Sequence, residues 1–141
     1  MKSLDDLILY GRENGCLDYK AKQYNKSKAI DLLKNIMAMA NGAYEGDEFI
    51  IVGVRQEAGD RFVPVGFDDP FVDPSTYEQL IHQNIEPDIN FEYFAHEIEG
   101  KKFGIFRIFG NSDRPYMMKK QKGDLHEGFC LIQQDQRIIA P

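Results

Sequence analysis

The stretch EFIIVGV, residues 48–54, is a nearly continuous run of apolar and β-branched side chains. A strand that is covered on both faces has this pattern, because neither of its faces meets water. We therefore predict that residues 48–54 form a central strand of a sheet. The other elements of the chain are predicted around this strand.

The segments before the central strand predict a short helix, a strand and a longer helix. Residues 3–15 begin with a serine N-cap, carry apolar side chains at helical spacing and end at a glycine. Residues 17–21 alternate between apolar and charged side chains, which predicts a strand with Asp18 and Lys20 on one face. An apolar stripe over residues 25–41 predicts a helix that ends at Asn-Gly.

The segments after the central strand predict an edge strand, a helix and a hairpin. Pro64 cannot donate a ladder hydrogen bond, so residues 61–65 suit a sheet edge. Residues 73–85 open with Asp-Pro-Ser, a helix cap and first turn. Residues 89–99 and 102–109 are strand-like runs around a Glu-Gly-Lys turn. Short late strands are predicted at residues 116–118 and 129–132.

The composition is that of one globular domain. The chain has 141 residues, of which 43% are hydrophobic and 12% aromatic, enough for a full core. We expect residues 1–141 to form a single α+β domain, a central mixed sheet flanked by about three helices. A membrane-length apolar run and a secretory signal are both missing from the sequence, which predicts a soluble cytoplasmic protein without membrane association. Cys16 and Cys130 are expected to be reduced.

The charge balance argues against broad attraction to nucleic acid but allows a local basic patch. The net charge is −6, whereas nonspecific binding depends on lysine and arginine that neutralise phosphates. The basic residues form two clusters: Lys20, Lys22, Lys26 and Lys28, and then Arg114, Lys119, Lys120 and Lys122. Tyr116 lies within the second cluster and could stack on a base. If the fold joins the clusters they form a basic groove; otherwise they are solvated surface.

Asp18 is an unusual residue for a strand, because aspartate competes for nearby backbone groups. It lies near Glu13 and Lys20, so two carboxylates and one ammonium fall within eight residues. This grouping is typical either of a phosphate or metal site or of a solvated strand face. The chain contains no Walker-type phosphate loop and no GxSxG motif, so the sequence carries no nucleotide motif.

The order of five segments resembles the Schlafen AlbA-type domain, also called the AlbA-2 or divergent AAA-associated domain. Glu13 with residues 17–20 is similar to the family's E…LEFK opening, and residues 38–41 to its AFAN helix end. Residues 51–54 resemble its IGV strand. Residues 85–89 and 114–119 are similar to its I.P.I and RPYYxK segments.

This resemblance implies a nucleic-acid-binding fold and, in the Schlafen branch, a metal-dependent RNA endonuclease. By position, Glu13 and Asp18 match the first two acids, which would hold Mg²⁺ or Mn²⁺, and Lys20 matches the lysine after them. The third acidic position falls on Gln56, with Glu57 one residue further on, so the acidic triad is incomplete. A one-residue shift along a strand reverses the direction of the side chain.

The sequence is compatible with three functions. The first is a nucleic-acid-binding module of DNA or RNA, regulatory or defence-related, with contacts expected from Lys20, Lys22, Arg114, Tyr116, Lys119 and Lys120. The second is a Mg²⁺- or Mn²⁺-dependent endoribonuclease with catalytic residues Glu13, Asp18, Lys20 and Glu57. The third is a protein-interaction or oligomerisation domain, in which the partner is a second copy of the chain or another protein.

Overall fold

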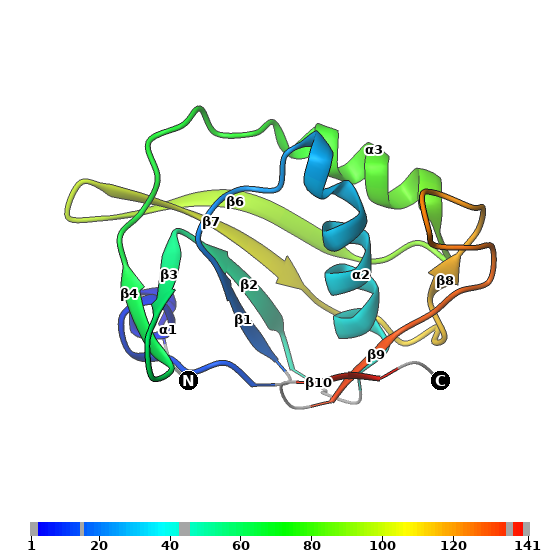
Figure 1. The fold of residues 1–141 in the computed structure, drawn as a ribbon, viewed down its shortest axis with the longest axis horizontal. Helices are drawn as coiled ribbons and strands as arrows, with labels where there is room; N and C mark the ends of the chain where they lie inside the picture. The colour runs from blue at the N-terminus through cyan, green and yellow to red at the C-terminus, as the bar shows by residue number, and fades with distance from the viewer. Residues whose placement is uncertain (1–2, 15, 43–45, 135–136, 140–141) are drawn as a thin grey trace.

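The computed structural model describes residues 3–14, 16–42, 46–134 and 137–139. The helices are α1 (Leu4–Tyr10), the 3₁₀ turn η1 (Lys26–Lys28), α2 (Ala29–Ala40) and α3 (Pro74–Asn84). The strands are β1 (Leu17–Lys20), β2 (Glu48–Val52), β3 (Val54–Glu57), β4 (Arg61–Pro64), β5 (Ile85–Glu86), β6 (Phe91–Ile98), β7 (Lys101–Ile108), β8 (Met117–Met118), β9 (Ile132–Gln134) and β10 (Arg137–Ile139). The α+β class with a mixed sheet and three helices agrees with the prediction (Figure 1).

The main sheet has the strand order β1-β2-β7-β6. β1 runs parallel to β2, and β7 runs antiparallel to both β2 and β6. The apolar run over residues 48–54 is central, as predicted, but it is divided at Gly53. Gly53 has a φ of +111°, and a Cβ there would lie 2.8 Å from the Phe103 ring, so only glycine suits the position. This turn leads the chain out of the main sheet into β3.

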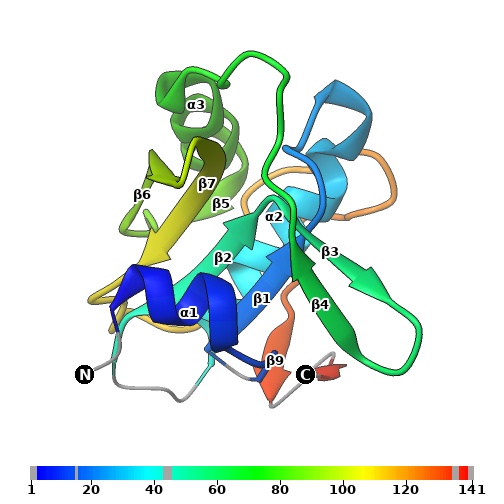
Figure 2. The same ribbon diagram turned by 90° about the vertical axis from the view of Figure 1, so that its left-hand side faces the viewer.

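Each face of the main sheet carries its own core (Figure 2). α2 and α3 cover one face, where side chains such as Leu33 and Ile81 pack against Ile50 and Phe106. α1 covers the other face, and Ile8 packs there with the alternate strand residues. Side chains of successive strand residues point to opposite faces, so a strand between two cores is apolar throughout. This explains the pattern of residues 48–52.

β3 and β4 form a two-stranded hairpin that starts at the C-terminal ends of β1 and β2 and runs to the side of β1 (Figures 1 and 2). Pro64 lies opposite Val54 in this hairpin, which agrees with the predicted edge position. Phe62 anchors the hairpin to the α1 side of the sheet, where its ring centroid is 4.9 Å from that of Tyr19. The hairpin therefore has one face toward this core and one face away from it.

Most of the predicted helix boundaries are close to those observed. The Ser3 side chain caps α1 by accepting from the Asp6 N–H at 3.1 Å, and the Asp73 side chain caps α3 by accepting from the Ser75 N–H at 2.9 Å. α1 ends at Tyr10 and is capped by Gly11, four residues before the predicted stop at Gly15, which lies outside the described residues.

The predicted late strand over residues 129–132 is wrong in its position, because β9 starts at Ile132. The residues before it form a loop that is held by β8. The Met118 N–H donates to the Phe129 carbonyl, and the Gly128 N–H donates to the Met118 carbonyl. Apolar Phe129 and Cys130 pack against the α2 side core from this loop, so their hydrophobicity reflects burial rather than strand pairing. Across the described residues, every helix is too short or too polar to cross a bilayer.

Candidate nucleic-acid interface

A groove of about 1060 Å³ lies between the chain that follows β1 and the segment that joins β4 to α3. Figures 1 and 2 show these two segments side by side beyond the C-terminal ends of β1 and β2. The cations that line the groove are Lys20, Lys22, Lys28, Lys34 and Arg55. The carboxylates that line it are Asp31, Asp68 and Asp69. The lining of the groove therefore holds two more cations than carboxylates, within an acidic chain.

Local structure explains why the cations meet there. Lys20 is the last residue of β1, and Lys22 follows it in the turn. α2 buries Leu32, Leu33 and Ile36, which leaves its opposite side, including Lys34, toward the groove. Arg55 reaches the groove from β3 because the chain turns at Gly53, whose N–H donates to the Lys20 carbonyl at 2.7 Å.

The groove cations differ in how far their charge is compensated. Three of them have a carboxylate partner: Lys20 with Asp18 at 3.2 Å, Lys28 with Asp31 at 3.8 Å and Arg55 with Glu57 at 2.9 Å. Within the part of the chain that the structure describes, Lys22 and Lys34 form no ion pair. These two ammonium groups are therefore the groove cations most available to a phosphate, and Asp68 and Asp69 offset part of the positive charge of the lining.

Gln23 joins the two sides of the groove. Its side chain is buried, and its Nε2 donates to the Asp69 carboxylate at 3.0 Å and to the Pro70 carbonyl at 2.9 Å. Its Oε1 accepts from the Val72 N–H at 3.0 Å and from the Tyr93 hydroxyl at 2.7 Å. All four hydrogen-bonding positions of the amide are filled, so the side chain is fixed in one orientation.

Glu13 and Asp18 come together, as their spacing in the sequence suggests. Glu13 Oε2 accepts from the Tyr19 N–H at 3.1 Å, at the outer edge of β1. Burial is the largest cause that raises the pKa of Glu13 to about 7, and the hydrogen bond that protonated Glu13 donates to the Asp18 carboxylate acts in the same direction. Lys20 has the opposite, smaller effect on the Glu13 pKa. Glu13 is therefore partly protonated near neutral pH.

Asp18 and Lys20 lie on the same face of β1, as the alternation predicts. Asp18 is in register with Ile50 and Lys20 with Val52, so both point to the α2 side of the sheet. β1 is an edge strand, and here the α2 face opens to the groove, so both side chains remain partly exposed at 19% and 35%. Asp18 is thus accommodated in a strand by its ion pair with Lys20 and its hydrogen bond with Glu13.

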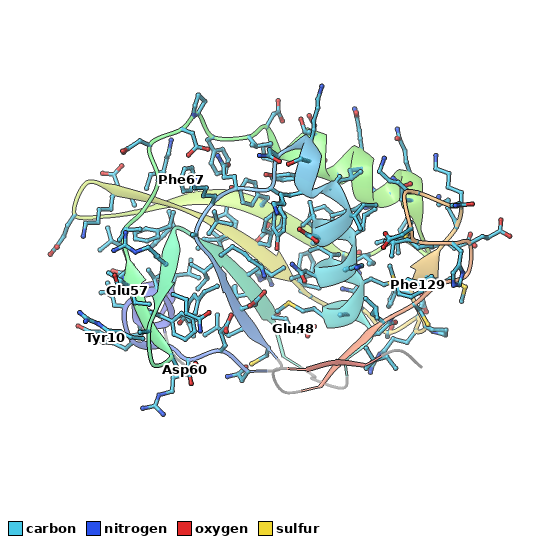
Figure 3. The ribbon with its side chains drawn as sticks, in the orientation of Figure 1. Tyr10, Glu48, Glu57, Asp60, Phe67 and Phe129 are labelled. Carbon is cyan, nitrogen blue, oxygen red and sulfur yellow. The ribbon has the colours of Figure 1, made fainter. Side chains whose placement is uncertain are left out.

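Gln56 and Glu57 lie on opposite faces of the β3–β4 hairpin. Gln56 is paired with Phe62 and so faces the α1 side, where its amide lies 3.5 Å from the Asp60 carboxylate. Glu57 shares the face of Arg55 and also lies 3.9 Å from Arg61. Glu57 is therefore held by arginines on the hairpin (Figure 3) and does not complete a set of three acids with Glu13 and Asp18.

The donor set for a divalent cation consists of two carboxylates. Among the described residues, no group of three or more His, Cys, Asp or Glu side chains is arranged to hold a metal ion. Glu13 and Asp18 offer hard carboxylate oxygens, which suit Mg²⁺ or Mn²⁺ when water fills the other positions. The proton that Glu13 holds near neutral pH would have to leave first, because a metal ligand is deprotonated. The residues present thus fit such an ion weakly.

The second basic cluster does not join the first. Arg114, Lys119 and Lys120 are absent from the lining of the groove. The Lys119 N–H donates to the Asn84 carbonyl at 2.8 Å, which places it at the end of α3 beside β8, far from the β3–β4 hairpin in Figure 1. Arg114 donates to the Gly42 carbonyl at 2.8 Å. The two clusters therefore do not form one basic groove: three lysines of the first cluster line it together with Lys34 and Arg55.

Arg114 lines a separate cavity of about 310 Å³ together with Glu48. Glu48 starts β2 and lies near the lower end of α2 in Figure 3, apart from Glu57. It is 5% exposed, and its Oε2 forms no hydrogen bond with the residues that the structure describes. Burial raises the pKa of Glu48 to about 8, although Arg114 acts in the opposite direction. Glu48 is therefore mainly protonated at pH 7.

Tyr116 is a core residue, which corrects the expectation that its ring stacks on a base. It is 1% exposed and packs in the core between the sheet and α2. Its N–H donates to Asn41 Oδ1 at 2.6 Å, and its hydroxyl accepts from the Asp113 N–H at 2.9 Å. A base could reach this ring only if the core opened.

Sequence patterns missed two of the groove cations. Lys34 had a usable signal, because it lies on the polar side of the predicted helix with Asp31 and Asn35. Arg55 had none, because its place in the groove depends on the turn at Gly53 and on the direction of β3. The groove is a tertiary feature that joins residues far apart in the sequence.

The fold and the groove define a small α+β module of the type found in AlbA-like domains. The chain belongs to the family described as Schlafen, AlbA_2, whose model matches residues 13–138. No curated protein matches the chain.

Two solved structures share the fold. One is the DIP2311 protein of Corynebacterium diphtheriae, with a TM-score of 0.59 and 15% identity over 90% of this chain. The chain spans 25% of the length of that protein. The other is from Nitrosomonas europaea, the N-terminal domain of a protein described as related to the ATP-dependent DNA helicase RecG. It has a TM-score of 0.53 and 18% identity, and the match covers 90% of this chain and 88% of that one.

Proposed function

We propose that the protein is a nucleic-acid-binding module and that the lysine-lined groove is its contact surface. The observation that carries this proposal is that five cations line one groove of a chain whose net charge is −6. Membership of the AlbA_2 family supports it, and a structural neighbour is described as related to a DNA helicase. Clustering of positive charge on one surface is the usual electrostatic footprint of nucleic-acid binding.

The groove cations would act in two ways. Lys22 and Lys34 have no carboxylate partner among the described residues and would contact phosphates directly. Lys20, Lys28 and Arg55 would exchange a carboxylate partner for a phosphate, which costs part of the gain because an existing ion pair is lost. Binding should therefore be weak and should fall as salt rises, since released counterions supply much of the driving force.

Fluorescence anisotropy with labelled DNA and RNA oligonucleotides tests this proposal. The groove variant Lys22→Glu/Lys34→Glu is compared with Lys119→Glu/Lys120→Glu, which makes the same change of charge outside the groove. We expect affinity at low salt to fall about tenfold or more in the groove variant and to stay near wild type in the control. Equal losses in both variants would mean that the charge of the whole chain, not the groove, governs binding.

The absence of any binding at low salt would contradict the proposal. The protein would then be better described as an interaction or oligomerisation domain, which size-exclusion chromatography with light scattering can examine. Such a result would leave the fold and the family unchanged, because neither depends on the charge of the groove.

A metal-dependent endoribonuclease is the second candidate, and the observation that favours it is the Glu13–Asp18 pair beside Lys20. Mg²⁺ or Mn²⁺ at this pair would activate a water molecule for attack on the phosphodiester. Glu13 and Asp18 would hold it, and Lys20 would offset phosphate charge. An RNA cleavage assay with Mn²⁺ should then lose activity in Asp18→Ala but not in Asp60→Ala. Cleavage that survives Asp18→Ala would exclude this pair as the centre.

A further inference from the structure

Three carboxylates line a groove whose proposed ligand is a polyanion. Asp31 has an evident role, because it pairs with Lys28 at 3.8 Å. Asp68 and Asp69 lie on the segment between β4 and α3, where they would repel phosphates. A carboxylate in such a place adds to binding only if it meets a hydrogen-bond donor of the ligand. The donors of a nucleic acid are on its bases and, in RNA, on the 2′-hydroxyl, whereas its phosphates only accept.

Asp69 is the better anchored of the two. Its carboxylate accepts from the buried Gln23 amide at 3.0 Å, and its carbonyl accepts from Lys102 Nζ at 2.9 Å. Gln23 is itself fixed by Val72 and Tyr93. Each carboxylate oxygen has two lone pairs, so both oxygens of Asp69 can still accept from a ligand. Side chains that are held by a supporting residue are suited to recognition, because less freedom is lost on binding.

The two sides of the groove differ in charge. The side formed by residues 20–35 carries four of the five cations, whereas the segment 65–72 carries two carboxylates among apolar side chains such as Phe67. Gln23 connects the two sides at Asp69. A strand that lies with its phosphates along the lysines would therefore turn its bases toward Asp69. Bases expose their hydrogen-bonding edges in this way only when they are unpaired.

We infer that the groove takes an unpaired stretch of nucleic acid and that Asp69 selects guanine within it. Guanine is the base whose Watson–Crick edge offers two adjacent donors, N1–H and N2–H₂, to the two oxygens of one carboxylate. Cytosine and adenine offer one amino group, and thymine or uracil offers one N–H between two carbonyl groups that a carboxylate repels. This inference rests on the proposed function, because it assigns a specificity to the same groove.

Binding of short labelled oligonucleotides tests the inference. The probes are the repeats (TTG)₄, (TTC)₄ and (TTA)₄ and the homopolymer T₁₂, with the corresponding RNA series. We expect wild type to bind (TTG)₄ about fivefold or more tightly than T₁₂, which corresponds to one good pair of hydrogen bonds. The preference for (TTG)₄ over T₁₂ is measured with the wild-type protein, so no substitution that could disturb folding affects the result.

Two matched variants assign the preference to a residue. Asp69→Asn keeps an acceptor for Gln23 but replaces one carboxylate oxygen with a donor, so the guanine preference should disappear. Asp68→Asn makes the same change of charge at the neighbouring residue, so it should keep the preference while binding all probes more tightly. Preference that is retained in Asp69→Asn or lost in Asp68→Asn would overturn the assignment.

The outcomes separate this inference from the proposed function. Equal affinity of wild type for (TTG)₄ and T₁₂ would overturn the guanine inference and leave the nucleic-acid proposal standing. Binding to neither probe at low salt would overturn the nucleic-acid proposal, and the inference with it.

Discussion

The carboxyl groups of Glu13 and Asp18 are hydrogen-bonded to each other, and Lys20 Nζ lies 3.2 Å from the second of them. Glu13 also accepts the Tyr19 N–H at the free edge of β1. The pair thus joins the chain before β1 to the strand itself. Glu13 itself has a pKa raised to about 7, beside the first cation of the groove.

The titration of Glu13 should depend on Asp18. Burial is the largest cause of the raised Glu13 pKa of about 7, and the hydrogen bond and charge of Asp18 are further causes. In Asp18→Ala the Glu13 pKa should therefore fall toward its ordinary value of 4.5 without reaching it. Carboxyl ¹³C chemical shifts against pH measure this change. An unchanged Glu13 pKa in Asp18→Ala would mean that burial acts alone.

Glu48 should make the folded state less stable as the pH rises. Its pKa is raised from 4.5 to about 8, so the folded state binds the proton more tightly than the unfolded chain. The stability from this proton is fully present below about pH 4.5 and is lost as the pH rises through about 8. The resulting change in the free energy of unfolding is on the order of a few kcal/mol.

The test is urea unfolding of Glu48→Gln between pH 5 and pH 9. This variant should show a flatter dependence of the free energy of unfolding on pH than wild type and should be more stable at pH 8. Glu78→Gln removes an exposed carboxylate of α3 and should follow the wild-type curve. Parallel curves for Glu48→Gln and wild type would show that Glu48 titrates normally.

Truncation of Asn41 should lower the stability of the fold more than truncation of most other polar residues. Its Nδ2 donates to the Tyr116 carbonyl at 2.9 Å and the Leu131 carbonyl at 2.8 Å, and its Oδ1 accepts from the Tyr116 N–H. Asn41→Ala would leave buried backbone groups unpaired, which should cost about 2 to 4 kcal/mol.

Chemical denaturation measures this cost, with Gln79→Ala on the exposed side of α3 as the control. The control should stay within about 0.5 kcal/mol of wild type. A loss in Asn41→Ala that is as small as in the control would show that water replaces the missing amide.

The sequence predicted most of the elements because their patterns are local. The apolar run of residues 48–52 and the stripe of α2 report burial directly, and Ser3 and Asp73 act as caps through neighbouring backbone groups. The late strand was misplaced because Phe129 and Cys130 are apolar for a packing reason that a strand pattern also produces.

The site was predictable only in part, because local sequence patterns do not show which distant segments meet. Glu13, Asp18 and Lys20 are close in sequence and meet in space. Arg55 joins the groove, and Tyr116 enters the core, only through contacts with distant segments. Two lysine clusters with similar composition therefore have different surroundings, which no local pattern reveals.

The central claim is that nucleic acid binds in the groove rather than on the second basic cluster. Backbone amide NMR shifts during titration with a short single-stranded oligonucleotide test it most directly. We predict that shifts concentrate in residues 20–35, 53–56 and 65–72, with little change in residues 114–120. Shifts centred on residues 114–120, or none at low salt, would contradict the account.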